Sequence, residues 1–241
     1  MLNNEGSTLR LELALERATA ARPSANVLAV AAMFGLGVDE ARTQTIIPPT
    51  TLELRGGAVV FITGASGSGK SSLLGLIDAE LAKRDDAAVL RFDSLDALPD
   101  LPLVDLFPNL SLPRALEMLS LAGLNDAFVM LRRPGELSDG QRYRLKLAQA
   151  MAMATVRPES DGRLLVVLAD ELGATLDRVT AAVIARNIRK WVSGQRHVCF
   201  VGATTHDDLL EFLQPDVLIE KELGSGVCVL DRAVMCQGGE A

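Results

Sequence analysis

The chain has 241 residues, of which 49% are apolar, so it can bury one sizeable core but is short for two full domains. Its formal net charge of −7 argues against a general nucleic-acid-binding surface, which needs a clustered excess of Lys and Arg. A local basic patch stays open as an alternative. We therefore predict a single α/β domain over residues 1–241.

The cysteines and the apolar stretches indicate a cytoplasmic protein. Cys199, Cys228 and Cys236 are odd in number and have no metal-binding spacing, so we expect reduced thiols. The N-terminus lacks the basic start and continuous apolar core of a secretory signal. The apolar stretch at 26–38 is shorter than the roughly 20 residues that a transmembrane helix needs. We expect no membrane segment.

Taken in chain order, the pattern predicts alternating strands and helices. Leucines alternating with other residues over 8–15 favour a half-buried strand, and a Gly-Gly turn at 56–57 joins a second strand to the buried strand that ends at Gly64. Helices are predicted over 70–84, 114–122, 126–132, 138–154 and 176–191, and further strands over 87–92, 163–170, 197–206 and 216–223. This alternation is typical of a mostly parallel sheet wrapped by helices.

A glycine-rich loop, GASGSGKSS, follows the buried strand and precedes the helix predicted over 70–84. Glycines in such a loop let backbone N–H groups converge on phosphate oxygens, while Lys70 neutralises them and the Ser71 hydroxyl ligates Mg²⁺. A chance Gly/Ser-rich turn is the alternative, which the flanking strand and helix disfavour. The predicted phosphate-binding residues are Gly64, Ala65, Ser66, Gly67, Ser68, Gly69, Lys70, Ser71 and Ser72.

Two carboxylates end the buried strand predicted over 163–170. We expect Asp170 to help hold Mg²⁺ and Glu171 to polarise an attacking water as a general base. An ordinary strand end that happens to be acidic is an equally good interpretation when this pair is considered alone.

A third pattern, LSDGQ at 137–141, opens the helix predicted over 138–154. The Ser138 hydroxyl and the amides near Gly140 would form a second anion-binding helix terminus, although a simple N-cap is the bland alternative. Together the three patterns resemble those of the ATP-binding cassette (ABC) family, whose signature is usually LSGGQ; Asp139 replaces its third residue. The resemblance implies a P-loop NTPase of ABC type, with a small antiparallel N-terminal strand region and a short helical insert at about 105–150.

The resemblance also implies an ATP hydrolase that uses ATP and Mg²⁺ in a homodimer. Two protomers would sandwich two ATP molecules, so that Ser138, Gly140 and Gln141 act on the nucleotide of the other copy. The stretch DELGATLD resembles the family's D-loop and adds Asp177, and GATTH places His206 as the switch histidine near the γ-phosphate. Glu171, His206 and Lys70 would be catalytic. Phe34 is the available aromatic residue upstream of the loop for stacking on adenine, whereas His197 is expected to be structural.

One departure from the family bears on the partner. Transport subunits carry a glutamine between the phosphate loop and the signature, but the chain has none between Lys70 and Gly140, where Asp105 is the nearest polar substitute. We therefore expect a soluble ATPase with an unidentified protein partner, most similar to a branch that in some relatives is fused to a predicted acetyltransferase domain, of which no segment is present.

Three alternatives remain open at this stage. The first is the nucleotide-binding subunit of a membrane transporter. The second is a DNA-associated ATPase that would use the basic residues around the signature, although no sustained heptads of the expected coiled coils occur. The third is a nucleotide-gated interaction module with negligible turnover. The basic residues are Arg132, Arg133, Arg142, Arg144 and Lys146.

Overall fold

The computed structural model describes residues 7–19, 24–35, 37, 42–95, 98–157 and 161–232. A six-stranded sheet forms its centre, in the order β4-β5-β6-β3-β7-β8. The first five strands of that order run parallel, and β8 pairs antiparallel with β7. The strands are β3 (Val59–Thr63), β4 (Ala87–Arg91), β5 (Leu164–Ala169), β6 (Val198–Ala203), β7 (Val217–Lys221) and β8 (Val227–Asp231).

The parallel arrangement explains the unbroken apolar runs in the sequence. Strands β3, β5 and β6 are buried at every residue, because helices or a second sheet cover both faces of the central sheet. All carboxyl ends of parallel strands lie at one edge, so the loops after β3, β5 and β6 meet there. The predicted α/β fold is confirmed, whereas the antiparallel strand β8 was not predicted.

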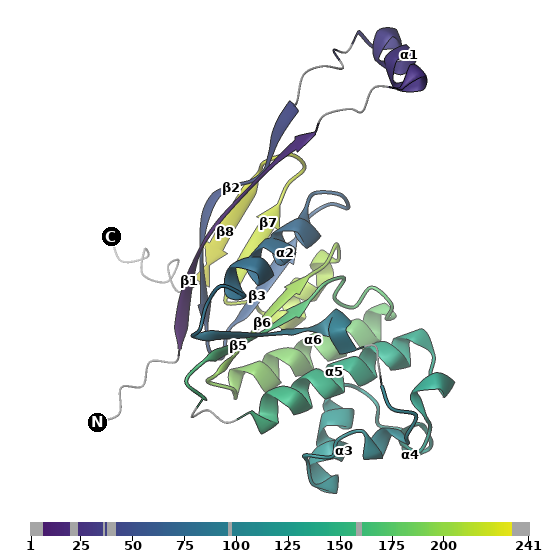
Figure 1. Ribbon diagram of the computed structural model, residues 1–241. Coiled ribbons are helices and arrows are strands. Elements are labelled where there is room, and N and C mark those ends of the chain that lie inside the picture. Colours follow the sequence, from purple (N-terminus) through teal and green to yellow (C-terminus); the bar gives the residue numbers. More distant parts are fainter. Residues whose placement is uncertain are drawn as a thin grey trace, which may run out of the picture.

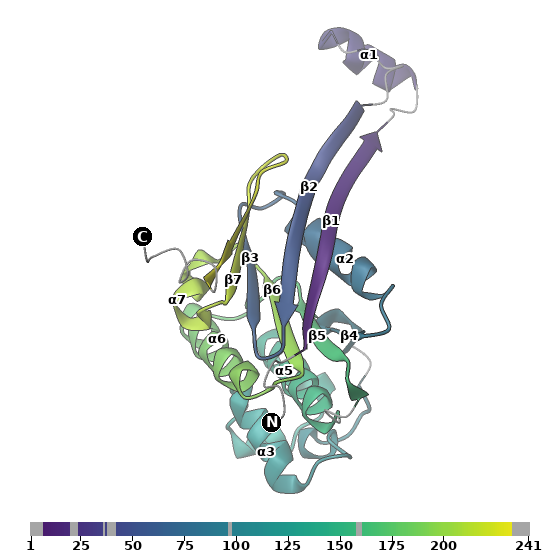
Figure 2. The same ribbon diagram turned by 90° about the vertical axis from the view of Figure 1, so that its left-hand side faces the viewer.

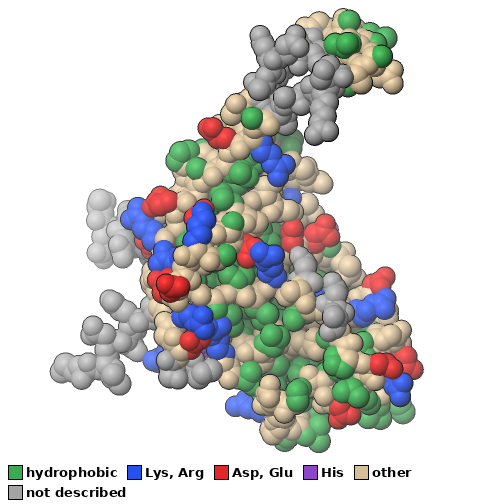
Figure 3. Space-filling model, viewed as in Figure 1, with side chains coloured by type: hydrophobic (Ala, Val, Ile, Leu, Met, Phe, Trp, Pro, Cys, Tyr) green, Lys and Arg blue, Asp and Glu red, His purple; other side chains and the backbone are tan. Residues whose placement is uncertain are grey.

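The N-terminal region forms a separate two-stranded antiparallel sheet of β1 (Thr8–Thr19) and β2 (Arg42–Arg55). Leu9, Leu11 and Leu13 are buried, which confirms the strand expected from their alternation. Beyond the end of this hairpin stands α1 (Ala25–Met33), away from the body of the molecule in Figures 1 and 2. Figure 3 shows hydrophobic side chains over α1, and mixed Lys, Arg, Asp and Glu side chains over the body.

The helices lie in two layers, one on each face of the central sheet. The hairpin and α2 contribute to a core cluster on one face, and α3, α5 and α6 contribute to the cluster on the other. Helix α5 lies close to α6 and α3 in Figure 1. The helices are α2 (Lys70–Leu81), α3 (Leu112–Leu121), α4 (Ala127–Met130), α5 (Asp139–Val156), α6 (Arg178–Ser193) and α7 (Leu210–Leu213), with 3₁₀ turns at Phe92–Leu95, Leu103–Asp105, Pro134–Glu136 and Asp207–Leu209.

No helix in the described ranges combines the length and the apolar character needed to cross a bilayer.

Candidate nucleotide site

The loop between β3 and α2 holds a buried lysine at the start of a helix. Lys70 is the first residue of α2, and its Nζ donates hydrogen bonds of 2.8 Å to the carbonyl oxygens of Gly64 and Ala65. Burial lowers the pKa of Lys70, while the nearby carboxylates of Asp170 and Asp207 act in the opposite direction. A desolvated ammonium beside the free N–H groups of a helix terminus is a site for an anion.

The loop needs glycine at its first position for two separate reasons. Gly64 has a φ of 139°, a conformation that other residues rarely adopt. A Cβ atom there would also lie 2.0 Å from the carbonyl oxygen of Lys221, at the end of β7. The backbone of the loop is therefore held directly against the neighbouring strand, which fixes where its N–H groups point.

A cavity of about 650 Å³ lies over this loop. It gathers most of the predicted phosphate-binding residues with the acidic pair after β5, and adds Ala174 and two threonines that follow β6. The threonines were not predicted. They follow β6, which pairs with the strand that leads into the loop, so knowledge of the strand order would have indicated them. The lining residues are Ala65, Ser66, Gly67, Gly69, Lys70, Ser71, Ser72, Asp170, Glu171, Ala174, Thr204 and Thr205.

The acidic pair has an unusual backbone. Asp170 Oδ1 accepts a hydrogen bond of 3.0 Å from the N–H of Glu171, and Glu171 has a φ of 50°, in the left-handed region. Such a conformation is uncommon for a glutamate and is a feature of functional sites, where the surrounding fold holds it in place. The turn presents the exposed Glu171 side chain to the cavity.

The polar groups of this cavity suit a nucleotide with Mg²⁺. The Ser71 hydroxyl and the Asp170 carboxylate line the cavity together, and Mg²⁺ prefers oxygen ligands of this kind combined with water and phosphate oxygens. The described residues contain no cluster of three or more His, Cys, Asp or Glu side chains that could enclose a metal alone. Ser68 Oγ is buried and has no hydrogen-bond partner in the described part of the chain, so a polar group in the loop remains available.

The signature residues lie at a different place in the chain's own fold. Ser138 caps α5, accepting a 3.3 Å hydrogen bond from the N–H of Gln141 and donating its own N–H to Gln141 Oε1 at 3.0 Å. Neither these two residues nor Gly140 line the 650 Å³ cavity. Within one copy, the structure therefore does not bring the signature to the phosphate loop.

The remaining predicted residues occupy positions around the cavity rather than in it. Asp177 caps α6, and a hydrogen bond from Thr180 lowers the pKa of its carboxyl. His206 follows Thr205 directly and is half-buried, with its N–H donating to Thr204 Oγ1 at 3.3 Å. His197 is buried, with Nε2 at 3.2 Å from the carbonyl oxygen of Ala154, as expected for a structural histidine.

The residue predicted to stack on adenine and the polar residue nearest to the missing glutamine do not line the cavity. Phe34 ends α1 with 73% of its surface exposed, and α1 stands beyond the far end of the β1–β2 hairpin. Asp105 ends the 3₁₀ turn at Leu103–Asp105 and does not line the cavity. The side chains of Ile46 on β2 and Lys221 on β7 do approach the loop, at 3.3 Å and 3.6 Å from a Cβ built on Gly69.

Three of the five basic residues near the signature make contacts within the described part of the chain. Arg133 pairs with Asp100, and Arg142 pairs with Asp139 at 2.6 Å. Arg144 donates to the carbonyl oxygens of Gly140 and Gly123. These contacts do not form the row of free cations that a nucleic-acid surface requires.

Comparisons with known proteins identify relatives that are ATP-binding proteins. No protein-family model matches the chain. The lipoprotein-releasing system ATP-binding protein LolD of Novosphingobium aromaticivorans is 32% identical over 204 residues, covering 70% of this chain and 84% of the relative. The macrolide export ATP-binding/permease protein MacB of Burkholderia lata is 27% identical over 220 residues, and the chain spans only 30% of its length.

A solved structure shares the fold. The dimeric structure of a post-hydrolysis state of the ATP-binding cassette MJ0796 bound to ADP and Pi has a TM-score of 0.56 and 21% identity, covering 79% of this chain and 92% of that one. Fold, loop and relatives together define a P-loop ATPase. The chain belongs to the ATP-binding cassette (ABC) family of ATPases, which confirms the predicted ATP hydrolase class and the use of ATP with Mg²⁺.

Proposed function

We propose that the chain hydrolyses ATP at two composite sites formed between two copies of itself, and that the cycle of pairing and separation drives a protein partner. The observation that carries this proposal is the division of the predicted residues. The phosphate loop and the acidic pair line one cavity, whereas Ser138 caps a helix outside it. In the proposed dimer, a second copy supplies the missing helix terminus.

In this proposal each residue has a defined role. Lys70 and the N–H groups of residues 65–71 bind the phosphates, and Ser71 and Asp170 hold Mg²⁺, which would neutralise charge on the phosphate oxygens. Glu171 takes the proton of the attacking water, and its exposed carboxylate is free to do so on the cavity side. His206 and the partner copy's signature act on the terminal phosphate. Thr204 and Thr205, which directly precede His206, line the cavity.

Two variants test the sharing of the site. Glu171→Gln should slow hydrolysis by roughly 10²-fold or more, the scale of losing a general base, and should accumulate the ATP-bound dimer. Ser138→Arg should block pairing while each copy still binds ATP. A matched control is Ser111→Arg, at the N-cap of α3, which lies outside the cavity and should leave turnover unchanged.

Mixing the two variants before ATP is added gives the decisive result. In a mixed dimer, one composite site carries both lesions and the other has an intact Glu171 and an intact Ser138. Recovery of ATPase activity that neither variant shows alone supports a shared site. Normal turnover by Ser138→Arg alone would show that each copy works by itself, and no recovery in mixed dimers that form by light scattering would contradict the shared site.

The partner proposed here is a membrane protein. The names of the relatives, a lipoprotein-releasing system and an export ATP-binding/permease protein, favour the transporter alternative over the soluble acetyltransferase-linked branch, for which no comparison offers support. A cytoplasmic ATPase subunit that acts on a permease is therefore our proposal, even though the expected glutamine is missing.

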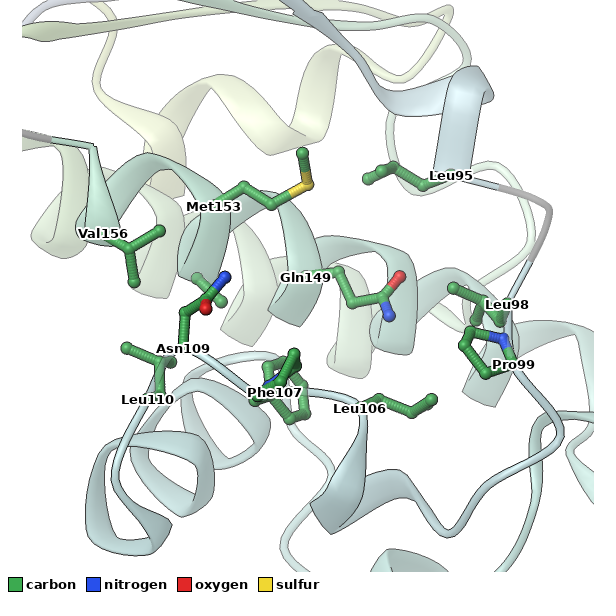
Figure 4. Close-up of a pocket in the computed structure, with 12 residues that line it drawn as sticks. Leu95, Leu98, Pro99, Leu106, Phe107, Asn109, Leu110, Gln149, Met153 and Val156 are labelled. Carbon is green, nitrogen blue, oxygen red and sulfur yellow. The ribbon is translucent and has the colours of Figure 1, made fainter.

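An apolar groove of about 260 Å³ gives this partner a place to dock (Figure 4). Gln149 extends from α5 into the groove among hydrophobic side chains; it is 9% exposed, and its Oε1 accepts no hydrogen bond from the described residues. The Oε1 atom itself is buried, so a docked segment would contact the exposed side chains of the groove, such as Met153 and Val156. The lining residues are Leu95, Leu98, Pro99, Leu106, Phe107, Pro108, Asn109, Leu110, Gln149, Ala152, Met153 and Val156.

Charge placed in the groove tests the docking role. Met153 and Val156 are 49% and 41% exposed, so Met153→Asp with Val156→Asp should fold normally and keep ATP turnover. We expect the variant to lose co-sedimentation with membranes of its own host. Val183→Asp, at a 51% exposed position on α6 outside the groove, is the control. Equal membrane association of all three proteins would contradict the proposal.

A further inference from the structure

A second, smaller cavity adjoins the nucleotide site. Its volume is about 170 Å³, and Ser71 and Asp170 line both this cavity and the larger one over the phosphate loop. The two cavities therefore meet at the two groups assigned above to Mg²⁺. The small cavity is lined by Ser71, Leu74, Gly75, Asp78, Arg91, Leu168 and Asp170.

The cation in this cavity comes from β4. Arg91 is the last residue of that strand and pairs in parallel register with Leu168, two residues before Asp170. Adjacent strands lie about 4.8 Å apart and rise about 3.3 Å per residue, which puts the Cα atoms of Arg91 and Asp170 about 8 Å apart. Alternation along the strands places both side chains on the α2 side of the sheet, where a long arginine spans most of this distance.

The Arg91 side chain is held at the outer end of the cavity by an ion pair with Asp78. Its Nη2 donates to Asp78 Oδ2, on the same face of α2 as Ser71 but about two turns further along. The Arg91 side chain is 61% exposed in this pair, so the pair contributes little to stability and can be exchanged. The Asp78 side chain is only 12% exposed, so its carboxylate lies in a fixed place and keeps the arginine near the site.

The route from Asp78 to Ser71 is open. Gly75 lies between them on α2, and a Cβ built there would meet no atom within 4 Å. Glycine inside a helix costs about 0.5–1 kcal/mol relative to alanine, and neither a positive φ nor a close backbone approach requires it at this position. The missing side chain leaves space beside the helix for a guanidinium.

We propose that Arg91 is a further phosphate-binding residue of the nucleotide site, which leaves Asp78, passes along Gly75 and binds the terminal phosphate of ATP. The proposal rests on the nucleotide site described under the proposed function and deepens it. Asp105, the nearest polar substitute for the missing glutamine, lines neither cavity, whereas Arg91 lines the smaller one. An arginine that contacts only the third phosphate distinguishes ATP from ADP, because ADP has no oxygen at that place.

Binding measured without hydrolysis tests the proposal. Calorimetry with ATP and with ADP, each in EDTA, reads affinity alone. Arg91→Ala should weaken ATP binding about 10-fold or more, the scale of losing a charge-assisted hydrogen bond, and should change ADP binding less than about 2-fold. Arg84→Ala is the control, because Arg84 forms a comparable surface pair with Asp86 at 2.7 Å. It should change neither affinity.

Variants at Asp78 and Gly75 test whether Arg91 moves to the phosphate or stays in its ion pair with Asp78. Asp78→Asn should strengthen ATP binding by releasing Arg91, and this gain should disappear when Arg91→Ala is added. A gain that persists in the double variant would show direct repulsion by Asp78 and overturn the proposal. Gly75→Leu should reproduce the ATP loss of Arg91→Ala with ADP binding intact, and unchanged ATP affinity there would also contradict it.

Failure of this proposal can be told apart from failure of the proposed function. If the unaltered protein binds no ATP, or if Lys70→Ala binds it equally well, the nucleotide site itself is wrong. If Lys70→Ala removes binding while Arg91→Ala keeps the normal ratio of ATP to ADP affinity, only the role of Arg91 is refuted.

Discussion

The hydroxyl oxygen of Tyr143 accepts a 3.0 Å hydrogen bond from the backbone N–H of Gly173. Tyr143 lies on α5, one turn after the signature, and Gly173 lies two residues after Glu171. The contact ties the helix proposed to act on the other copy's nucleotide to the turn that holds this copy's own base. In the proposed dimer, this contact would connect the two sites through each chain.

Tyr143→Phe should loosen this connection while preserving the packing of the ring. Phe92 lies with its ring centroid 4.9 Å from that of Tyr143, and a phenylalanine keeps this contact. The buried Gly173 N–H loses its acceptor, so we expect a loss of about 1–2 kcal/mol in the free energy of unfolding. Urea titration measures this loss. Steady-state kinetics should show lower turnover with unchanged ATP affinity, and an unaltered turnover would show that the link has no functional role.

Lys70→Ala should abolish ATP binding. The substitution removes the buried positive charge whose Nζ lies 2.8 Å from two loop carbonyl oxygens, and no other group described in the loop carries a full positive charge. We expect affinity measured by calorimetry to fall by about 100-fold or more. Lys83→Ala, beyond the other end of α2 and paired with Glu80, should bind ATP normally. Equal affinity of both variants would refute the assignment of the loop.

Gly64→Ala should damage the loop without touching the chemistry of Lys70. The new methyl group would lie 2.0 Å from the Lys221 carbonyl oxygen, so β7 or the loop must move. We expect a lower melting temperature together with weaker ATP binding. Gly135→Ala, where a Cβ meets nothing within 4 Å, should change neither property. A variant at position 64 with normal melting and normal affinity would contradict the described loop geometry.

The two described cysteines should differ sharply in their chemistry. Cys199 is buried on β6, and burial raises the pKa of its thiol to about 12 from an ordinary value of 9.0. A thiol-alkylating reagent, followed by mass spectrometry, should modify the exposed Cys228 in the native state and Cys199 only after unfolding. Rapid native labelling of Cys199 would show that β6 is not protected. Cys236 lies outside the described residues.

The same thiol predicts a dependence of stability on pH. Because its folded-state pKa is raised, the protonated thiol stabilises the fold fully below pH 9, and this contribution is lost as pH rises toward 12. Between pH 9 and 11 the loss amounts to about 2 kcal/mol. Urea unfolding of Cys199→Ala should show a shallower decline over this range than the unaltered protein. Parallel declines would assign the alkaline instability to other groups.

Much of the sheet could be predicted because strands that are buried on both faces consist of apolar residues. The runs at β3, β5 and β6 are apolar on both faces, and β3 is followed by a glycine and β5 by a carboxylate. Strand β8 was missed since Val227–Asp231 is only partly buried and pairs at the sheet edge. Helix α1 carries apolar residues on all sides, so it shows no amphipathic period from which to predict a helix against a core.

The site could be predicted only as far as its residues are neighbours in sequence. The loop at Gly64–Ser72 and the pair Asp170–Glu171 form local patterns, and both lie in the cavity. Arg91, which we propose as a further residue of the site, has no sequence pattern of its own because it is a lone arginine at a strand end. Only the register of β4 against β5 brings it to Ser71 and Asp170. The register between strands that are far apart in the sequence cannot be predicted from residue types alone.

The position of β3 in the sheet has a consequence for how the protein comes to exist in the cell. Val59 pairs with Phe200, and Val60 pairs with Val217, so the strand that leads into the phosphate loop has both of its neighbours more than a hundred residues further along. During synthesis the loop leaves the ribosome long before the strands that hold it in shape. A nascent chain that stops short of β6 and β7 has the sequence of an ATP site but no template to form it, and it must be kept from aggregating until about residue 221 has emerged.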